Sequence, residues 1–326
     1  MTGRPRPDID ALAEAVLRGD RMHLAKAITL IESRHPDDVA PAQDLLARLL
    51  PHTGAAHRIG ITGVPGVGKS TFIEAFGLQR VEEGRRVAVL AVDPSSSVSG
   101  GSILGDKSRM NRLAQREEAF IRPSPAGVSL GGVARRTRET VFLCEAAGFD
   151  IILVETVGVG QSETVVADMV DLFLVLMLPG AGDELQGIKR GVLELADLVA
   201  VNKSDGDQLA AARIAQSEYS SVLRYTRGEV DGWSPRAFCV SALTGGGLDE
   251  LWEKIQQHRE TLTMNGRWEG KRREQRRSWL RSLLTEAVLD AFHSRPGVAS
   301  RLTEVENAVL EGRMTAVQGV RELLGS

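Results

Sequence analysis

An eight-residue stretch with the spacing of a phosphate-binding loop, Gly-x-x-x-x-Gly-Lys-Ser, runs from Gly63 to Ser70. Glycines let backbone N–H groups turn inward around a chain of phosphates, and a helix that starts at the end of the loop points its positive end at the same place. Lys69 is predicted to reach the β- and γ-phosphates, and the Ser70 hydroxyl to bind Mg²⁺. The alternative is a glycine-rich turn without a ligand. The predicted phosphate contacts are Gly63, Val64, Pro65, Gly66, Val67, Gly68, Lys69, Ser70 and Thr71.

A second motif, Asn202-Lys203-Ser204-Asp205, follows an apolar run and is predicted to select the base. A strand that ends there places the motif at the carboxyl edge of an open α/β sheet, where such folds bind ligands. The Asp205 carboxylate can accept from both N1–H and the exocyclic amine of guanine, whereas adenine lacks that pair of donors. A backbone N–H at Ser241-Ala242, which ends a later run, is predicted to meet the guanine carbonyl. The predicted base contacts are Asn202, Lys203, Asp205, Ser241, Ala242 and Leu243.

Acidic residues between these two motifs are candidates for the metal and the γ-phosphate. Glu155 follows the apolar run Ile151–Val154, and Gly158 lies three residues later. In GTP-binding domains an acid here orders the water shell of the metal, and the glycine N–H senses the terminal phosphate. Asp93 closes an earlier apolar run and Asp106 lies in a glycine-rich segment. The alternatives are a solvated strand end for Glu155, a turn or helix cap for Asp93 and a plain loop acid for Asp106.

Short apolar runs rich in β-branched residues alternate with helical stretches after Pro51. Runs of this kind fit strands covered on both faces, which means a mostly parallel sheet with crossover helices. The predicted strands are Arg58–Thr62, Val87–Val92, Ile151–Val154, Leu172–Leu178, Leu198–Val201 and Ala237–Val240. The predicted helices between them are Ser70–Glu82, Val133–Ala147, Ile188–Ala196 and Asp207–Leu223.

Helical periodicity occupies both ends of the chain. Residues 8–50 carry apolar side chains at helical spacing and predict three short helices. The helical pattern returns from about residue 261, with a break at Arg295-Pro296-Gly297. We therefore expect an N-terminal helical extension over residues 1–50, a P-loop GTPase domain over 51–260 and a C-terminal helical arm over 261–326.

The composition excludes several classes of protein. With 326 residues, 42% apolar and 25% charged, the chain has ordinary globular usage and is not a disordered, collagen-like or rod-forming sequence. A net charge of −3 gives no global reason to bind nucleic acid or anionic lipid. Two cysteines, Cys144 and Cys239, are too few for a disulfide scaffold or a cysteine-rich zinc site. The start lacks the apolar block of a secretory signal, and the longest apolar run, Leu172–Leu178, is far too short to span a membrane. We expect a cytoplasmic protein.

Four longer strings resemble one family in particular. They are Asp93-Pro-Ser-Ser, Gly100-Gly-Ser-Ile-Leu-Gly-Asp106-Lys-Ser-Arg-Met, Glu155-Thr-Val-Gly-Val-Gly-Gln161-Ser and Asp183-Glu-Leu-Gln-Gly-Ile-Lys189-Arg-Gly. Together they resemble the methylmalonyl-CoA mutase-associated GTPases, the MeaB/ArgK family, and the resemblance covers the whole chain.

The resemblance implies a P-loop GTPase that converts GTP and water to GDP and phosphate with Mg²⁺. It implies a chaperone of an adenosylcobalamin-dependent acyl-CoA mutase, methylmalonyl-CoA mutase, that gates cofactor loading and protects or reactivates the mutase. It also implies a homodimer formed through the C-terminal arm. Residues 183–190 correspond to a third switch, in which Lys189 approaches the nucleotide when the mutase binds. The implied metal ligands are Ser70, Asp93, Asp106 and Glu155, and the implied catalytic residues are Lys69, Asp93, Asp106, Glu155, Gly158 and Lys189.

Slow turnover by the isolated protein is expected, because position 159 is Val where many GTPases place a water-orienting Gln. Gln161 lies two residues further on, and a rearrangement of residues 183–190 on mutase binding is the expected accelerator.

Other functions stay open at this point. The chain could be a nucleotide-dependent switch with incidental hydrolysis, or a small-molecule kinase, as an older family label for arginine and ornithine transport suggests. Nickel delivery fits poorly, because the six histidines are scattered. The basic segment from Arg267 to Arg281 could contact nucleic acid, but a solvated helix face whose tryptophans pack inward or across a dimer is the preferred interpretation.

Overall fold

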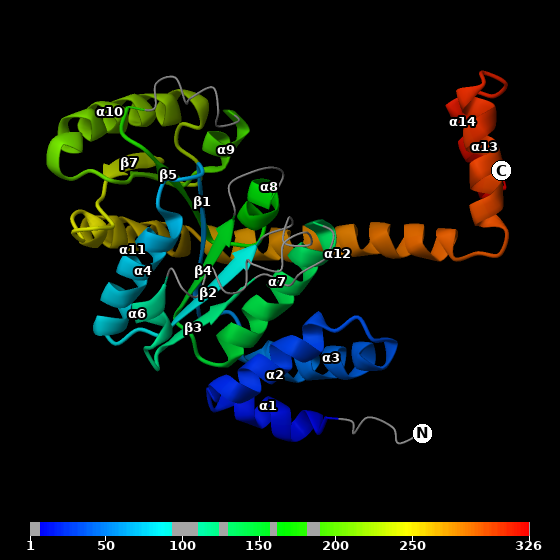
Figure 1. The fold of residues 1–326 in the computed structure, drawn as a ribbon, viewed down its shortest axis with the longest axis horizontal. Helices are drawn as coiled ribbons and strands as arrows, with labels where there is room; N and C mark the ends of the chain where they lie inside the picture. The colour runs from blue at the N-terminus through cyan, green and yellow to red at the C-terminus, as the bar shows by residue number, and fades with distance from the viewer. Residues whose placement is uncertain (1–6, 93–109, 124–129, 157–161, 181–189, 326) are drawn as a thin grey trace. The chain divides into compact units, whose positions relative to one another are not determined.

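A parallel β-sheet forms the centre of the chain in the computed structural model (Figure 1). The structure describes residues 7–92, 110–123, 130–156, 162–180 and 190–325. Within these residues the sheet has seven strands in the order β3-β2-β4-β1-β5-β6-β7, and every neighbouring pair is parallel. The predicted sheet is therefore confirmed, and β1 lies at its middle, where the strand order reverses. Open α/β sheets bind their ligands at such a point, beyond the carboxyl ends of the strands.

The strands are short and almost wholly buried, and β2, β5 and β6 are unbroken apolar runs, as burial on both faces requires. Their bounds are β1 His57–Gly63, β2 Val87–Val92, β3 Ala119–Arg122, β4 Ile151–Thr156, β5 Leu172–Met177, β6 Leu198–Val201 and β7 Arg236–Cys239. Every residue of β1, β4, β5 and β6 is buried.

Helices cover both faces of the sheet. One face carries α4 (Lys69–Glu82), α6 (Asn111–Ala114) and α11 (Leu248–Met264), which bury phenylalanine, leucine and isoleucine side chains against it. The other face carries the crossover helices α7 (Leu130–Ala146), α8 (Ser162–Ala167), α9 (Arg190–Leu195) and α10 (Leu209–Thr226). Among the described connections are two single turns of 3₁₀ helix, η1 (Leu50–His52) and η3 (Gly206–Gln208).

Three N-terminal helices, α1 (Ile9–Leu17), α2 (Arg21–Glu32) and α3 (Pro36–Leu49), extend the second face and are blue in Figure 1. Asp8 and Asp20 cap α1 and α2 by accepting hydrogen bonds from first-turn N–H groups, and Pro36 starts α3 at the position where its missing N–H costs nothing. All three pack on one another and against α7. Their apolar faces continue the core on that side of the sheet. The three helices themselves were predicted from the sequence.

The close approach of α8 to β1 depends on Gly60 in the middle of that strand. A Cβ atom at Gly60 would lie 2.7 Å from Phe173 and 3.0 Å from the Val166 and Val170 side chains. Those side chains fill the space of the missing methyl group and bring α8 down onto the strand that leads into the phosphate-binding loop.

The described chain divides into two compact units, Met1–Trp268 and Glu269–Ser326. The C-terminal helices are α12 (Arg267–His293), α13 (Val298–Leu310) and α14 (Ala316–Leu324), and the predicted break at residues 295–297 separates α12 from α13. The predicted domain boundaries after residues 50 and 260 stay predictions. Among the described helices, none combines the length and the apolar character needed to cross a bilayer.

Several elements differ from the sequence expectation, and the short helices α6 and α8 were not predicted. The edge strand β3 was not predicted, because its run of four residues ends in Arg122 and follows two glutamates. The helix expected from about residue 261 belongs to α11, which begins at Leu248, directly after a run of three glycines.

Candidate nucleotide site

The loop between β1 and α4 has the backbone geometry of a phosphate cradle. Gly68 has φ +91°, in the left-handed region, and precedes the first residue of α4. A Cβ atom at Gly68 would lie 3.0 Å from Nδ2 of Asn202, and one at Gly63 would lie 2.5 Å from the Leu176 carbonyl oxygen. Glycine is therefore required at both positions, for conformation and for space. The loop ends on the amino terminus of a fourteen-residue helix, where N–H groups face outward.

Lys69, the first residue of α4, turns back across this loop. Its Nζ donates a hydrogen bond to the Gly63 carbonyl oxygen at 2.9 Å. Burial lowers the pKa of Lys69, and the negative charges of Glu155 and Glu163 oppose that effect. The ammonium group is thus partly desolvated and faces two carboxylates, so a phosphate chain entering the loop meets a cation already held in place.

Asn202 joins the base motif to the phosphate loop. Its Nδ2 donates to the Val67 carbonyl oxygen at 2.8 Å, and its Oδ1 accepts from the Ala242 N–H at 3.1 Å. The side chain is buried and both halves of its amide are satisfied. One residue therefore fixes three loops, at the ends of β1, β6 and β7, relative to one another.

Lys203 and Asp205 lie on either side of the Ser204 turn. Lys203 has φ +61°, which is unusual for a residue other than glycine, and its Nζ donates to the Gly66 carbonyl oxygen at 3.0 Å. Its aliphatic stem consequently crosses the loop. The Ser241 hydroxyl donates to Oδ2 of Asp205 and accepts from the Thr244 N–H at 3.1 Å. The Asp205 carboxylate is thereby oriented by the loop that follows β7.

The sequence offered a backbone N–H of Ser241-Ala242 to the guanine carbonyl, and in this structure the Ala242 N–H donates to Oδ1 of Asn202. The adjacent residue, Leu243, has an exposed side chain, and no described residue accepts a hydrogen bond from its N–H. The contacts of Ser241, Ala242 and Leu243 with a base stay predictions.

Glu155 lies inside β4 rather than beyond its end. It pairs in register with Ile61 of β1 and Ala91 of β2, and only 9% of its surface is exposed. The solvated strand end considered as its alternative is thus not what the structure has. The next residue, Thr156, donates its hydroxyl to Oγ1 of Thr62 at 2.7 Å, which joins β4 to the strand that precedes the phosphate loop.

The structure brings together the phosphate loop, Glu155 and the base motif, but it does not describe every predicted site residue. Asp93, Asp106, Gly158 and Lys189 lie outside the described residues, as do Val159, Gln161 and Asp183. Their roles stay predictions.

Glu163 is a site residue that the sequence reasoning missed. It lies in the first turn of α8, and 6% of its surface is exposed. The negative charge of its carboxylate favours the protonated form of Lys69 and so raises the pKa of that lysine, against the effect of burial. The sequence shows only a glutamate near a helix start, which is an ordinary feature of such a position, so its burial could not be predicted.

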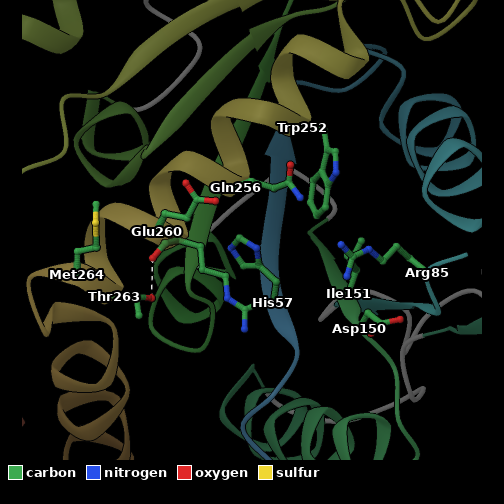
Figure 2. Close-up of a pocket in the computed structure, with 10 residues that line it drawn as sticks. His57, Arg85, Asp150, Ile151, Trp252, Gln256, Glu260, Thr263 and Met264 are labelled. Atoms are coloured by element: carbon green, nitrogen blue, oxygen red, sulfur yellow. Dashed lines mark hydrogen bonds between the residues drawn. The ribbon is translucent and has the colours of Figure 1, made fainter. Parts of the chain in front are cut away.

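A separate pocket of about 480 Å³ lies at the opposite edge of the sheet. It opens at His57 and Ile151, the first residues of β1 and β4, whereas the phosphate loop follows the last residue of β1. Figure 2 shows the side chains of α11 on one side of this pocket and Arg85 and Asp150 on the other. The pocket is therefore distinct from the nucleotide site.

The chain is a P-loop protein with the motif order of guanine-nucleotide-binding domains. The phosphate loop follows β1, Glu155 lies in β4, and the base motif follows β6. Residues 24–297 match the family model described as methylmalonyl-CoA mutase-associated GTPase MeaB. The chain belongs to that family, as the sequence strings indicated.

Similar proteins cover nearly the whole chain. A putative GTPase of Caulobacter vibrioides is 54% identical over 99% of this chain and 98% of its own length. The mitochondrial methylmalonic aciduria type A homolog of Mus musculus is 46% identical over 94% of this chain and 76% of its own length. A solved structure entitled LAO/AO transport system kinase is 40% identical, covers 99% of both chains and superposes with a TM-score of 0.81.

Proposed function

We propose that the chain binds and hydrolyses GTP with Mg²⁺ and acts as a chaperone of an adenosylcobalamin-dependent acyl-CoA mutase, for which it gates cofactor loading. The family description supports the association with methylmalonyl-CoA mutase. The observation that carries the nucleotide part is the Asn202 junction, because it holds a phosphate cradle and a carboxylate suited to guanine in one rigid arrangement.

In this proposal the chain's own groups divide the work by position. The loop N–H groups and Lys69 take the charge of the β- and γ-phosphates, and Asp205 accepts from N1–H and the exocyclic amine of guanine. Water attacks the γ-phosphorus in line, a new P–O bond forms, and the bond to the β-γ bridging oxygen breaks to release GDP. Positioning and charge neutralisation supply most of the rate.

The donors at the site fit Mg²⁺. Ser70 and Glu155 provide hard oxygen ligands, which this ion prefers, and Glu163 has a buried carboxylate oxygen without a hydrogen-bond partner among the described residues. Within the described residues, no group of three or more His, Cys, Asp or Glu side chains forms a metal cage. Mg²⁺ is usually held by one or two carboxylates together with substrate phosphates, and when bound it neutralises developing phosphate charge.

Self-association through the C-terminal unit is the second part of the proposal. Leu280, Leu284 and Val288 of α12 are each more than half exposed and recur at four-residue intervals, so they form one apolar stripe. Val320 and Leu324 of α14 are exposed in the same way. Exposed apolar faces of this size mark interaction surfaces, and a second copy of the chain is the occupant that the family resemblance favours.

Calorimetry with GDP and ADP tests the nucleotide assignment. GDP is expected to bind with Mg²⁺ and ADP to bind at least about tenfold more weakly, since adenine leaves the Asp205 carboxylate without its donors. The Asp205→Asn variant is expected to prefer xanthine nucleotides, because a carboxamide presents a donor where guanine also has one. Unchanged guanine preference in that variant would remove Asp205 from the base site.

The chaperone assignment is tested by turnover in the presence of a client. GTP hydrolysis is measured with and without an adenosylcobalamin-dependent acyl-CoA mutase that co-purifies with the chain, and the mutase is expected to accelerate it. An unchanged rate contradicts the coupling. Using GTP labelled at the γ-phosphate separates this function from a kinase, which transfers the label to an organic acceptor instead of releasing it as phosphate.

A further inference from the structure

Glu163 is a buried carboxylate to which the nucleotide assignments above give no specific role. Its surface is 94% covered, and Oε2 has no hydrogen-bond partner among the described residues. Burying a carboxylate without compensation is costly, and an unsatisfied acceptor inside a protein indicates a missing partner.

The position of α8 places this carboxylate beside the phosphate loop. Val166, one turn after Glu163 on the same side of α8, packs directly on Gly60 of β1. The helix returns from the carboxyl ends of the strands toward their amino ends, because it connects β4 to the parallel strand β5. Glu163 is therefore about 4.5 Å nearer the carboxyl edge than Val166, which corresponds to one or two residues beyond Gly60 in the direction of the phosphate-binding loop.

Lys69 lies at the same end of β1, where its half-buried ammonium group donates to the Gly63 carbonyl oxygen at 2.9 Å. The negative charges of Glu155 and Glu163 favour the protonated form of this lysine. The described part of the site therefore holds two buried carboxylates, the half-buried ammonium group of Lys69 and the exposed ammonium group of Lys203 on the phosphate loop.

The two buried carboxylates oppose a bare nucleotide. A phosphate chain adds several negative charges to the site that holds them, and at partly buried positions such repulsion is only weakly screened. A divalent cation with its water shell offsets this repulsion. Mg²⁺ keeps several of its waters when bound in proteins, and each such water is a hydrogen-bond donor for a carboxylate oxygen.

Resting on the proposed function, we infer that Glu163 is a positioning residue that couples nucleotide binding to a divalent cation. Its unpartnered oxygen accepts a hydrogen bond from the hydration shell of the cation, and its charge disfavours nucleotide that arrives without one. Glu163 thus acts through water and Lys69 rather than as a direct ligand.

The test compares GDP affinity with saturating Mg²⁺ and with excess chelator, in the full chain. In the Glu163→Gln variant the affinity without Mg²⁺ is expected to rise roughly fivefold to thirtyfold, because one repelling charge is removed. The affinity with Mg²⁺ is expected to fall, so the gain that Mg²⁺ provides shrinks by at least about tenfold. Loss of a merely structural carboxylate weakens binding under both conditions alike and overturns the inference.

Two further variants control for charge and for folding. Glu253→Gln removes the same charge from an exposed position of α11 and is expected to leave both affinities unchanged. Glu163→Asp keeps the charge and is expected to restore most of the Mg²⁺ dependence, and a failure to do so counts against the inference. Wild-type protein that binds no GDP under either condition defeats the proposed function as well, whereas normal wild-type binding with an unchanged ratio in Glu163→Gln defeats only the role of Glu163.

Discussion

The two compact units of the chain differ in how far their apolar residues are buried. In Met1–Trp268 whole strands are buried and both faces of the sheet are covered by helices. In Glu269–Ser326 the apolar residues Leu280, Leu284 and Val288 are more than half exposed. The first unit is therefore stabilised by its own buried core. The second unit has an exposed apolar surface, and covering that surface would be favourable. Nucleotide recognition and assembly are expected to be separable properties of the two units.

The largest effect is expected in the core of the first unit. Phe76 is fully buried, stacks on Phe72 and meets the edge of Trp252. Phe76→Ala is expected to lower the free energy of unfolding by about 3–5 kcal/mol, measured by urea denaturation. The matched change in the second unit, Leu284→Ala, is expected to cost less than about 0.5 kcal/mol at concentrations where the chain is monomeric. Similar losses for both variants would break the comparison.

Removing the phosphate-binding cation is expected to have the next largest effect. Lys69→Ala is expected to weaken GDP binding roughly a hundredfold or more, since charge-assisted hydrogen bonds to two phosphates are lost. Calorimetry measures the affinity, and sedimentation velocity is expected to show unchanged self-association. A Lys69→Ala protein that no longer self-associates would show that the two units are not independent.

A smaller effect is expected when charge enters the apolar stripe of α12. The double variant Leu280→Asp/Leu284→Asp is expected to raise the dimer dissociation constant by at least about tenfold, because two carboxylates must be desolvated on association. Ser282→Asp, on an exposed position of the same helix, serves as the matched control. GDP affinity is expected to stay within about twofold of wild type in both variants. Unaltered sedimentation of the double variant argues for another occupant of the stripe.

The mildest probe asks whether the first unit is closed to solvent. Cys144 is fully buried, and burial raises the pKa of its thiol, with the charge of Glu145 adding to the shift. A raised pKa means less thiolate at any given pH, so Cys144 is expected to resist iodoacetamide at pH 8 in the native state. Cys239, which is partly exposed, is expected to react first. Mass spectrometry of the labelled peptides distinguishes the two, and early labelling of Cys144 contradicts a closed core.

The sequence predicted the fold because most strands contain an apolar run between recognisable turn residues. Six of the seven strands followed from this pattern, and the phosphate loop and Asp205 motif fell at strand ends as predicted. The order of the strands within the sheet was not predicted. The edge strand β3 was not predicted, because a strand at the edge of a sheet is less buried and can include a polar residue such as Arg122. The start of α11 at Leu248 had a visible signal in Leu251, Trp252 and Ile255, whose spacing is helical.

The candidate site was less predictable than the fold, because burial of a polar group is a tertiary property. The sequence identified Glu155 from its place after an apolar run but could not show that it lies within β4. It offered a backbone N–H of Ser241-Ala242 to the base but could not show that the Ala242 N–H donates to Asn202, because that bond forms only where the two loops meet. Glu163 was missed for the same reason.

The amide of Asn202 has a consequence for any attempt to retune this chain. This one side chain makes two hydrogen bonds, one to the phosphate-binding loop and one to the loop that follows β7. Phosphate binding and base recognition therefore both depend on the position of Asn202. A substitution at position 205 alone should change the preferred purine with little loss of affinity for the phosphates. A substitution at position 202 should weaken both phosphate binding and base recognition. Base specificity can therefore be changed by substitution at Asp205, whereas Asn202 must be kept for the site to hold its shape.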